Sequence, residues 1–381
     1  MKKIGILTHY YNTVNFGGAL QSYALCECLN QKGFKAEQIP YKYTRVKQPE
    51  STLDKLKRHG ISGLFKHFKD KAYRKLNEKE IKSVKEKKQA AFASFLNEAI
   101  PHSNDVYTNE SIQNCVAEYD CFITGSDQVW NGYNPVYFLD FVSENKKRIS
   151  YAASLGREYL TDAQKEVYKE SLKKFNAVSV REPSAINLIK DTTTASVVST
   201  IDPTLLLEKE DWDKVSSDKL IEEDYIFCYF LGDYKKTRKL VDRFAKKHNL
   251  KIAFIPYTAG IVPSDKKFGD FRFIDASPED FVSLIKHAKY VFTDSFHAVV
   301  FSHIYKKEFF VFNRDKRALM NGRIKDITSL FGCTERYCDT EKKMTLDYIE
   351  SLKTLDYSKE TDEFLIKKKE SIEFLENNLK D

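Results

Sequence analysis

The sequence predicts an α/β protein with two Rossmann-like, doubly wound domains. Its 381 residues exceed what one compact core of ordinary size holds. Short apolar runs alternate with helical patterns, and this alternation starts again near residue 225. Aromatic residues make up 13% of the chain, which is ample for packed cores. We therefore expect two parallel sheets, each covered by helices.

The first series of elements begins at the N-terminus. The apolar run KKIGIL predicts a buried strand, and GGALQSYALCECLNQKG predicts a helix that ends at Gly33. The segments DCFITGSDQVWN, RISYAASLG and AVSVRE predict three further strands. We assign this series to an N-terminal domain, residues 1–190, with a basic helical insertion at about 51–100.

The second series begins with the strand YIFCYFLG, residues 225–232. A basic helix near 235–248 follows, and the strands LKIAFIPY, KYVFTD and EFFVFN come after it. We assign this series to a C-terminal domain, residues 191–357. The last helix, within residues 358–381, is expected to pack across both domains.

The basic surplus of the chain lies in one segment, residues 51–90, which holds thirteen Lys or Arg and five Asp or Glu. Its apolar residues recur at three- and four-residue steps, which predicts an amphipathic helix with a basic outer face. These residues are Ile61, Leu64, Phe65, Phe68, Ala72 and Leu76. Such a helix can contact an anionic membrane or guide an anionic substrate, and a solvated helix packed on its own domain is the alternative. No nucleic-acid partner is expected, because the segment matches no usual binding module.

The chain carries no segment of about 18 apolar residues, the length that a membrane span requires. The apolar start IGIL is too short for a signal peptide. The seven cysteines are scattered and form no C-x-x-C pair, which predicts reduced core residues and no structural zinc. We therefore expect a cytoplasmic protein, and contact with the inner face of the cell membrane through residues 51–90 is a further hypothesis.

Polar residues at strand-to-helix turns are the candidate ligand-binding residues, because ligands of open parallel sheets bind outside the carboxyl ends of the strands. NFGGALQ places two glycines at the first such turn, where backbone N–H groups can approach an anion. Its glycine spacing is not that of a dinucleotide site, and a tight turn without a ligand is the alternative. Asn15, Gly17 and Gln21 are the candidate lining residues, assigned to acceptor binding.

The loop GSDQVWN, residues 125–131, follows another predicted strand. A tryptophan ring beside amide and hydroxyl groups is typical of a sugar site, because the ring stacks on the sugar and the polar groups bind its hydroxyls. The acceptor-binding candidates here are Ser126, Gln128, Trp130 and Asn131. Trp130 could equally cap the core. Asp127 could act as a general base or cap a helix.

Two further candidates, Arg181 and His297, lie at other strand-to-helix turns. Arg181 ends AVSVR, where a guanidinium can hold a carboxylate or phosphate through two hydrogen bonds, and a structural pair with Glu182 is the alternative. His297 lies in the first turn of a helix that Asp294 or Ser295 can cap. The helix dipole there favours a neutral imidazole, which a general base requires. A hydrogen-bonded structural histidine is the alternative.

Together these segments resemble the polysaccharide pyruvyl transferase family. The resemblance lies in NFGGALQSYAL, FITGSDQVWN, RISYAASLG, VSVRE, IDPTLLL, VFTDSFHAVVFS and RIKDI, and it runs from about residue 4 to 336. It implies a GT-B-like pair of domains with the active site in the cleft between them. It also implies transfer of the pyruvyl group of phosphoenolpyruvate to a sugar, as a ketal on a bacterial surface polysaccharide or its precursor.

The resemblance also implies roles for particular residues. His297 matches the family's active-site histidine, and Arg181 matches a donor-binding arginine. A common form of the motif is S-R-x-H, and Ser295 stands here in place of its arginine. Arg314, Arg317 or Arg323 could supply this donor-binding charge from the next loop. With Asp127 as the second catalytic residue, no metal or cofactor is expected beyond phosphoenolpyruvate as donor substrate.

The implied partner is a sugar or lipid-linked oligosaccharide acceptor, and the oligomeric state is left open. Two alternatives remain. One is a GT-B-like glycosyltransferase that uses a nucleotide-sugar. The other is a non-catalytic sugar-binding relative, for which Ser295 is the main support.

Overall fold

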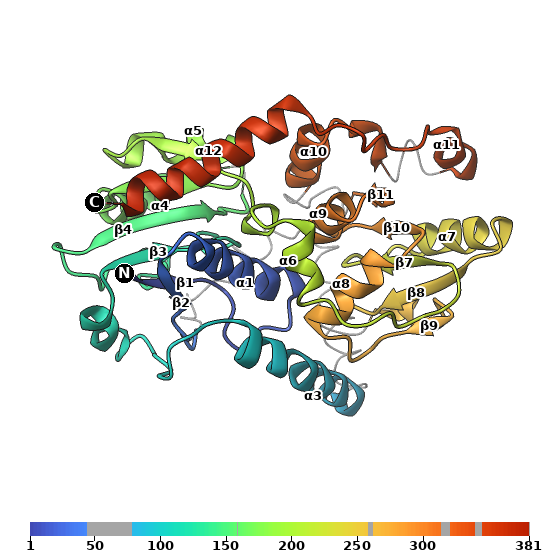
Figure 1. Ribbon diagram of the computed structural model, residues 1–381, viewed down its shortest axis with the longest axis horizontal. Coiled ribbons are helices and arrows are strands. Elements are labelled where there is room, and N and C mark those ends of the chain that lie inside the picture. Colours follow the sequence, from blue (N-terminus) through green and yellow to red (C-terminus); the bar gives the residue numbers. More distant parts are fainter. Residues whose placement is uncertain (44–77, 158, 258–261, 314–320, 340–344, 381) are drawn as a thin grey trace, which may run out of the picture.

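The strands form two parallel sheets, one in each domain (Figure 1). The computed structural model describes residues 1–43, 78–157, 159–257, 262–313, 321–339 and 345–380. Within these ranges each sheet has six strands, in the orders β2-β1-β3-β4-β5-β6 and β12-β11-β10-β7-β8-β9. The predicted two-domain α/β architecture is confirmed.

The first sheet contains β1 Lys3–Leu7, β2 Lys35–Gln38, β3 Cys121–Thr124, β4 Lys147–Ala153, β5 Ala177–Val180 and β6 Val197–Ser199. Its helices are α1 Phe16–Gln31, α3 Glu78–Ser94, α4 Asp162–Leu172 and α5 Pro183–Ile189. Because β6 pairs with β5, the first sheet ends at residue 199 and not at the expected boundary of 190.

The second sheet contains β7 Tyr225–Tyr229, β8 Lys251–Ile255, β9 Phe271–Arg272, β10 Tyr290–Thr293, β11 Glu308–Phe312 and β12 Tyr337–Cys338. Its helices are α7 Lys235–Lys247, α8 Pro278–Lys286, α9 Phe296–Ile304, α10 Asn321–Leu330 and α11 Leu346–Ser351. The connection between the sheets carries a short 3₁₀ helix, Pro203–Leu205, and α6, Lys209–Asp213.

One apolar core runs through both domains. Phe16 of α1 stacks on Phe281 of α8, with the ring centroids 4.7 Å apart. Trp212 of α6 packs against Tyr23 of α1 and against Phe301 of α9. One hydrophobic cluster therefore contains buried residues of both domains, which favours a fixed domain arrangement, and each domain also has a cluster of its own.

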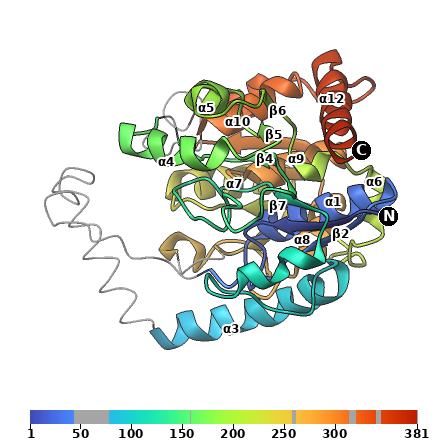
Figure 2. The ribbon, with the colours of Figure 1, turned by 90° about the vertical axis from the view of Figure 1, so that its left-hand side faces the viewer.

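Two helices connect the domains at opposite sides of the molecule, as Figures 1 and 2 show. Helix α12, Asp362–Leu379, packs Phe364 against His303 of the second domain and Phe374 against Tyr151 of the first. Helix α3 carries Lys88, whose ammonium donates to the backbone carbonyls of Pro256 and Tyr257 at 3.1 and 2.8 Å.

All seven cysteines lie in described parts of the chain, and all are buried free thiols, as predicted. None of the helices in the described ranges is long and apolar enough to cross a membrane. Most of the basic segment 51–90 lies outside the described residues. Its described part belongs to α3, where Lys82, Lys85 and Lys87 are exposed and Lys88 is buried.

Candidate active site

A cleft of about 520 Å³ lies between the domains. As expected for parallel sheets, its walls come from turns at the carboxyl ends of strands in both domains. The first domain contributes His9, Thr13, Val14, Asn15, Gly17, Asp127, Gln128, Asn131 and Arg181. The second contributes Tyr229, Leu231, Tyr257, Ser295, Phe296, His297 and Arg323. The structure therefore brings nine of the sequence candidates into one cleft.

His297 crosses from the second domain to the first. It lies in the first turn of α9, and its ring covers Gly17 in the first turn of α1. A Cβ atom at Gly17 would lie 2.0 Å from the His297 Nδ1 atom. Gly17 is therefore required because the imidazole occupies the space that any side chain would take.

Asp202 holds His297 and Arg181 together behind the cleft. Its Oδ2 atom lies 2.7 Å from Arg181 Nη1 and 3.6 Å from His297 Nε2. Its Oδ1 atom accepts hydrogen bonds from the backbone N–H and the hydroxyl of Thr204. The last contacts place Asp202 at the N-cap of the 3₁₀ helix in the interdomain connection. One buried carboxylate thus orients both a guanidinium and an imidazole.

The Asp202 and Arg181 charges are mutually stabilised. Burial alone would raise the pKa of the Asp202 carboxyl, but His297, Arg181 and Thr204 hold it well below its usual range. Burial opposes the charge of Arg181 as well, yet Asp202, Glu182 and Asp127 raise the pKa of its guanidinium. Both groups therefore remain charged near neutral pH.

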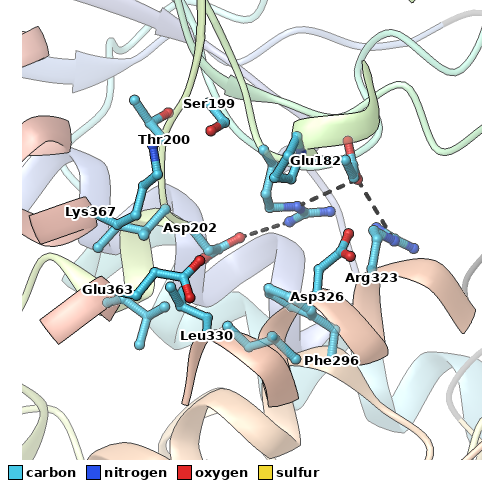
Figure 3. Close-up of a pocket in the computed structure, with 15 residues that line it drawn as sticks. Glu182, Ser199, Thr200, Asp202, Phe296, Arg323, Asp326, Leu330, Glu363 and Lys367 are labelled. Atoms are coloured by element: carbon cyan, nitrogen blue, oxygen red, sulfur yellow. Dashed lines mark hydrogen bonds and ion pairs between the residues drawn. The ribbon is translucent and has the colours of Figure 1, made fainter. Parts of the chain in front are cut away.

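The charged groups continue from Asp202 toward α10, as Figure 3 shows. Glu182 Oε1 lies 3.8 Å from Arg181 Nε and 3.8 Å from Arg323 Nε, and it accepts a hydrogen bond from the Ser154 hydroxyl. The Arg181 guanidinium also lies 4.9 Å from the centre of the Phe296 ring. A smaller cavity of about 100 Å³ adjoins this network. Arg181 therefore forms the structural pair with Glu182 and also lines the cleft, and the binding of an anionic ligand by its guanidinium stays a prediction.

Asp127 lines the cleft and has an unusual backbone conformation. Its φ is +75°, a left-handed conformation that is uncommon for residues other than glycine. Its backbone carbonyl accepts a hydrogen bond from Ser154 N–H at 2.9 Å. Such strain is often found at functional sites. Asn131 nearby accepts a hydrogen bond from Arg157 at 2.8 Å, which fixes its amide.

Three acceptor candidates lie outside the cleft. Trp130 is fully buried, stacks on Phe138, and donates its indole N–H to the Tyr137 carbonyl, so its interpretation as a sugar platform is wrong and it caps the core. Gln21 is buried under the cleft and donates to the Thr8 hydroxyl. Ser126 is also buried and donates to Asp202 Oδ2 at 3.2 Å.

The start of α9 differs in detail from the prediction. Ser295 is the N-cap residue, but its side chain makes no capping hydrogen bond. Asp294 instead accepts from the backbone N–H groups of Leu231 and Gly232, which ties the end of β7 to β10. Arg314 and Arg317 lie outside the described residues. Arg323 reaches the cleft from α10.

Among the residues that sequence reasoning missed are His9, which lines the cleft, and Asp202 behind it. His9 follows β1 by two residues, at the carboxyl end of that strand, and this position was its signal. Burial lowers the pKa of its imidazole, against the attraction of Asp127. Asp202 belongs to IDPTLLL, where an acidic residue before Pro and Thr is a helix-capping signal only. In the described parts of the chain, no group of three or more His, Cys, Asp or Glu side chains could hold a metal ion.

The fold and cleft define a two-domain α/β protein of the GT-B type. A family model described as polysaccharide pyruvyl transferase matches residues 15–316, which is most of the chain. The protein therefore belongs to the polysaccharide pyruvyl transferase family. The matched range includes Asp127, Arg181, Asp202 and His297 but not Arg323.

Solved structures of other proteins share the architecture. UDP-N-acetylglucosamine 2-epimerase from Rickettsia bellii is 11% identical, with a TM-score of 0.55 over 100% of this chain and 96% of that one. UDP-GlcNAc 2-epimerase from Methanocaldococcus jannaschii is 10% identical, with a TM-score of 0.48 over 95% of each chain. At 11% identity, the likeness to the structure from Rickettsia bellii shows the fold alone. A search of curated proteins gives no significant match.

Proposed function

We propose that the protein transfers the pyruvyl group of phosphoenolpyruvate to two hydroxyls of a sugar, forming a pyruvate ketal on a bacterial surface polysaccharide or its precursor. Family membership supports the class of reaction. The observation that carries the proposal is the buried Asp202 carboxylate, which holds Arg181 and His297 at one side of the cleft. A cation for an anionic donor and a titratable group for proton transfer are thus fixed together.

Arg181 and Arg323 are the proposed donor-binding residues. Phosphoenolpyruvate carries a phosphate and a carboxylate, and guanidinium groups bind both kinds of anion through paired hydrogen bonds. Arg323 comes from α10 and Arg181 from the end of β5, so they approach the cleft from different domains. In this arrangement Arg323 supplies the charge that the common family motif places at Ser295.

The reaction requires one acid and one base. A proton is added to C3 of the donor, and a sugar hydroxyl then attacks C2 and gives its proton to a base. The C2–O bond to phosphate breaks, phosphate leaves with the electron pair, and the second hydroxyl attacks C2 and loses its proton. We assign the acid to His297 and the base to Asp127, with His9 beside it. Asn15, Gln128 and Asn131 are placed to hold the acceptor.

Asp202 is a positioning residue in this scheme. It lies behind His297 and Arg181 and is 1% exposed, so it cannot contact the substrates directly. Its Oδ2 atom lies 3.6 Å from the Nε2 atom of the His297 imidazole, so the carboxylate faces that side of the ring.

The test is the thermal stability of the purified protein with phosphoenolpyruvate. Ligand at a hundredfold excess over Kd stabilises the folded state by about 2.7 kcal/mol. Arg181→Lys should reduce this effect while leaving a cation beside Asp202, and Arg323→Gln should reduce it without touching Asp202. Arg243→Ala is the matched control, because this exposed arginine lies on α7, outside the cleft.

Loss of the effect in both cleft variants and its retention in the control would support the proposal. An unchanged effect in Arg181→Lys and Arg323→Gln would overturn the donor assignment. A panel of nucleotide-sugars is measured in parallel, and stabilisation by these alone would indicate a glycosyltransferase. No stabilisation by either class would favour a non-catalytic sugar-binding protein.

The proposal includes a lipid-linked acceptor at the inner face of the cell membrane. Its support is the basic surplus of residues 51–90. Anionic vesicles attract such segments by about 1 kcal/mol per basic residue near the surface. Reversal of the lysines of residues 51–87 to glutamate, which spares the buried Lys88, should abolish binding to phosphatidylglycerol vesicles and leave phosphoenolpyruvate binding intact. Equal vesicle binding by both proteins would refute the membrane contact.

A further inference from the structure

A second cavity of about 320 Å³ adjoins the cleft on the side of the first domain. The two cavities share four lining residues, His9, Thr13, Gln128 and Asn131. A molecule in the cleft can therefore extend into the second cavity without crossing the core. We call this second cavity the tyrosine pocket, after the residues that form most of its wall.

Aromatic rings line the pocket. Tyr43 lies nearly parallel to Tyr137 with the ring centroids 6.4 Å apart, and His9 meets Tyr137 edge-on at 4.6 Å. Tyr133 also lines the pocket. Tyr43 is 52% exposed and Tyr133 is 47% exposed. Much of these two rings is therefore open to a ligand.

Hydrogen bonds made by the tyrosine hydroxyls hold the pocket in shape. The Tyr133 hydroxyl donates to Asp140 at 2.6 Å, and the Tyr41 hydroxyl is paired with Asn109 and Asn134. These bonds fix the position of Tyr133, whose ring is half exposed, and of Tyr41, which is buried against Tyr137. Rigid rings lose little conformational entropy when a ligand packs on them.

The chemistry of the wall selects a neutral, polyhydroxylated ring. Aromatic faces pack on the apolar C–H face of a sugar, and amides bind its hydroxyls. The amides in the wall are those of Gln128, Asn131 and Asn134. Among the described residues, no Lys, Arg, Asp or Glu lines the pocket. A phosphate or nucleotide diphosphate would therefore have no counter-charge there.

We propose that the tyrosine pocket binds a second, neutral sugar residue of the acceptor, next to the residue that receives the pyruvyl group. This inference rests on the proposed function for the order of the two sugars. It makes the acceptor an oligosaccharide of at least two residues. Sugar binding in the pocket itself does not require phosphoenolpyruvate, so the two proposals can be tested separately.

The experiment compares the full-length protein and its variants on an array of neutral mono- and oligosaccharides, followed by titration of the best-bound glycan. The wild type should bind oligosaccharides and bind their component monosaccharides at least tenfold more weakly. Tyr43→Ala should weaken oligosaccharide binding about five- to tenfold, the range expected for one aromatic packing contact. Tyr43→Phe should retain binding, because it keeps the ring.

Tyr159→Ala is the control, since Tyr159 is 69% exposed and lies outside the pocket. Phosphoenolpyruvate stabilisation is measured on the same samples. Unchanged oligosaccharide binding in both Tyr43→Ala and Tyr133→Ala would overturn the proposal, as would no oligosaccharide binding by the wild type. Loss of phosphoenolpyruvate binding alone would instead count against the proposed function, and the pocket assignment would stand on the sugar titration.

Discussion

Gly17→Ala tests the contact between the domains at His297, the proposed acid. The new methyl carbon would lie 2.0 Å from His297 Nδ1, 2.2 Å from Cε1 and 2.8 Å from Cγ. Carbon and nitrogen atoms pack at about 3.5 Å or more, so the ring must move by about 1.5 Å. Misplacement of a reacting group by about 1 Å can lower a rate about a hundredfold.

The global stability should respond differently. Gly17 does not have a positive φ, and alanine in a helix is favoured over glycine by about 0.5–1 kcal/mol. The imidazole is the end of a side chain and can turn away, so we expect the free energy of unfolding to change by about 1 kcal/mol or less. The variant should therefore fold and fail in catalysis.

The assay is phosphate release from phosphoenolpyruvate with the best-bound oligosaccharide, alongside urea unfolding and the ¹⁵N resonances of the histidine rings. Gly322→Ala is the control, because a Cβ there meets no atom within 4 Å and the residue is also helical. Turnover at the wild-type rate with an unmoved His297 resonance would refute the reasoning, since it would mean that the two groups do not share this space.

The remaining predictions concern buried charges. Asp202→Asn should lower the free energy of unfolding by about 3–5 kcal/mol in urea titrations, because Arg181 stays buried without its anion. Because the pKa of Asp202 is lowered in the folded protein, the ionised carboxylate contributes its full stabilisation above a pH of about 4. This contribution is lost as the pH falls further. An acid-unfolding transition of the wild type that is no steeper than that of Asp202→Asn would contradict this prediction. Burial lowers the pKa of Lys88 to about 8, so the charged amine destabilises the fold below that pH. From pH 8 to 10.5 the wild type should gain up to about 3 kcal/mol relative to Lys88→Met in urea titrations, and parallel pH profiles would refute this.

The sequence predicted the interior of both sheets and missed their edges. The eight predicted strands are β1, β3, β4 and β5, and β7, β8, β10 and β11, which occupy the central positions of the two sheets. The four missed strands, β2, β6, β9 and β12, are the edge strands. A central parallel strand is covered on both faces and reads as a continuous apolar run. The missed strands have two to four residues and are partly exposed, so no such run marks them.

Residues of the candidate site could be predicted where their position after a strand is enough to place them at the cleft. His297, Arg181 and Asp127 follow strands at their carboxyl ends, and the topology of parallel sheets brings such residues to one edge. Trp130 shows the limit of this reasoning, because its position in a loop does not say whether the ring points to the cleft or to the core. Asp202 lies in the connection between the domains, and its contacts depend on how the domains pack.

Because Asp202 lies in the connection between the domains, the candidate site forms only when both domains and this connection are assembled. The imidazole comes from one domain, the glycine beneath it from the other, and the carboxylate that orients it from the segment between them. Neither half of the protein expressed alone would contain the His297 imidazole together with the Arg181 guanidinium. Under the proposed function, cleavage of the chain near residue 200 should therefore abolish pyruvyl transfer, because it separates the parts that assemble the site.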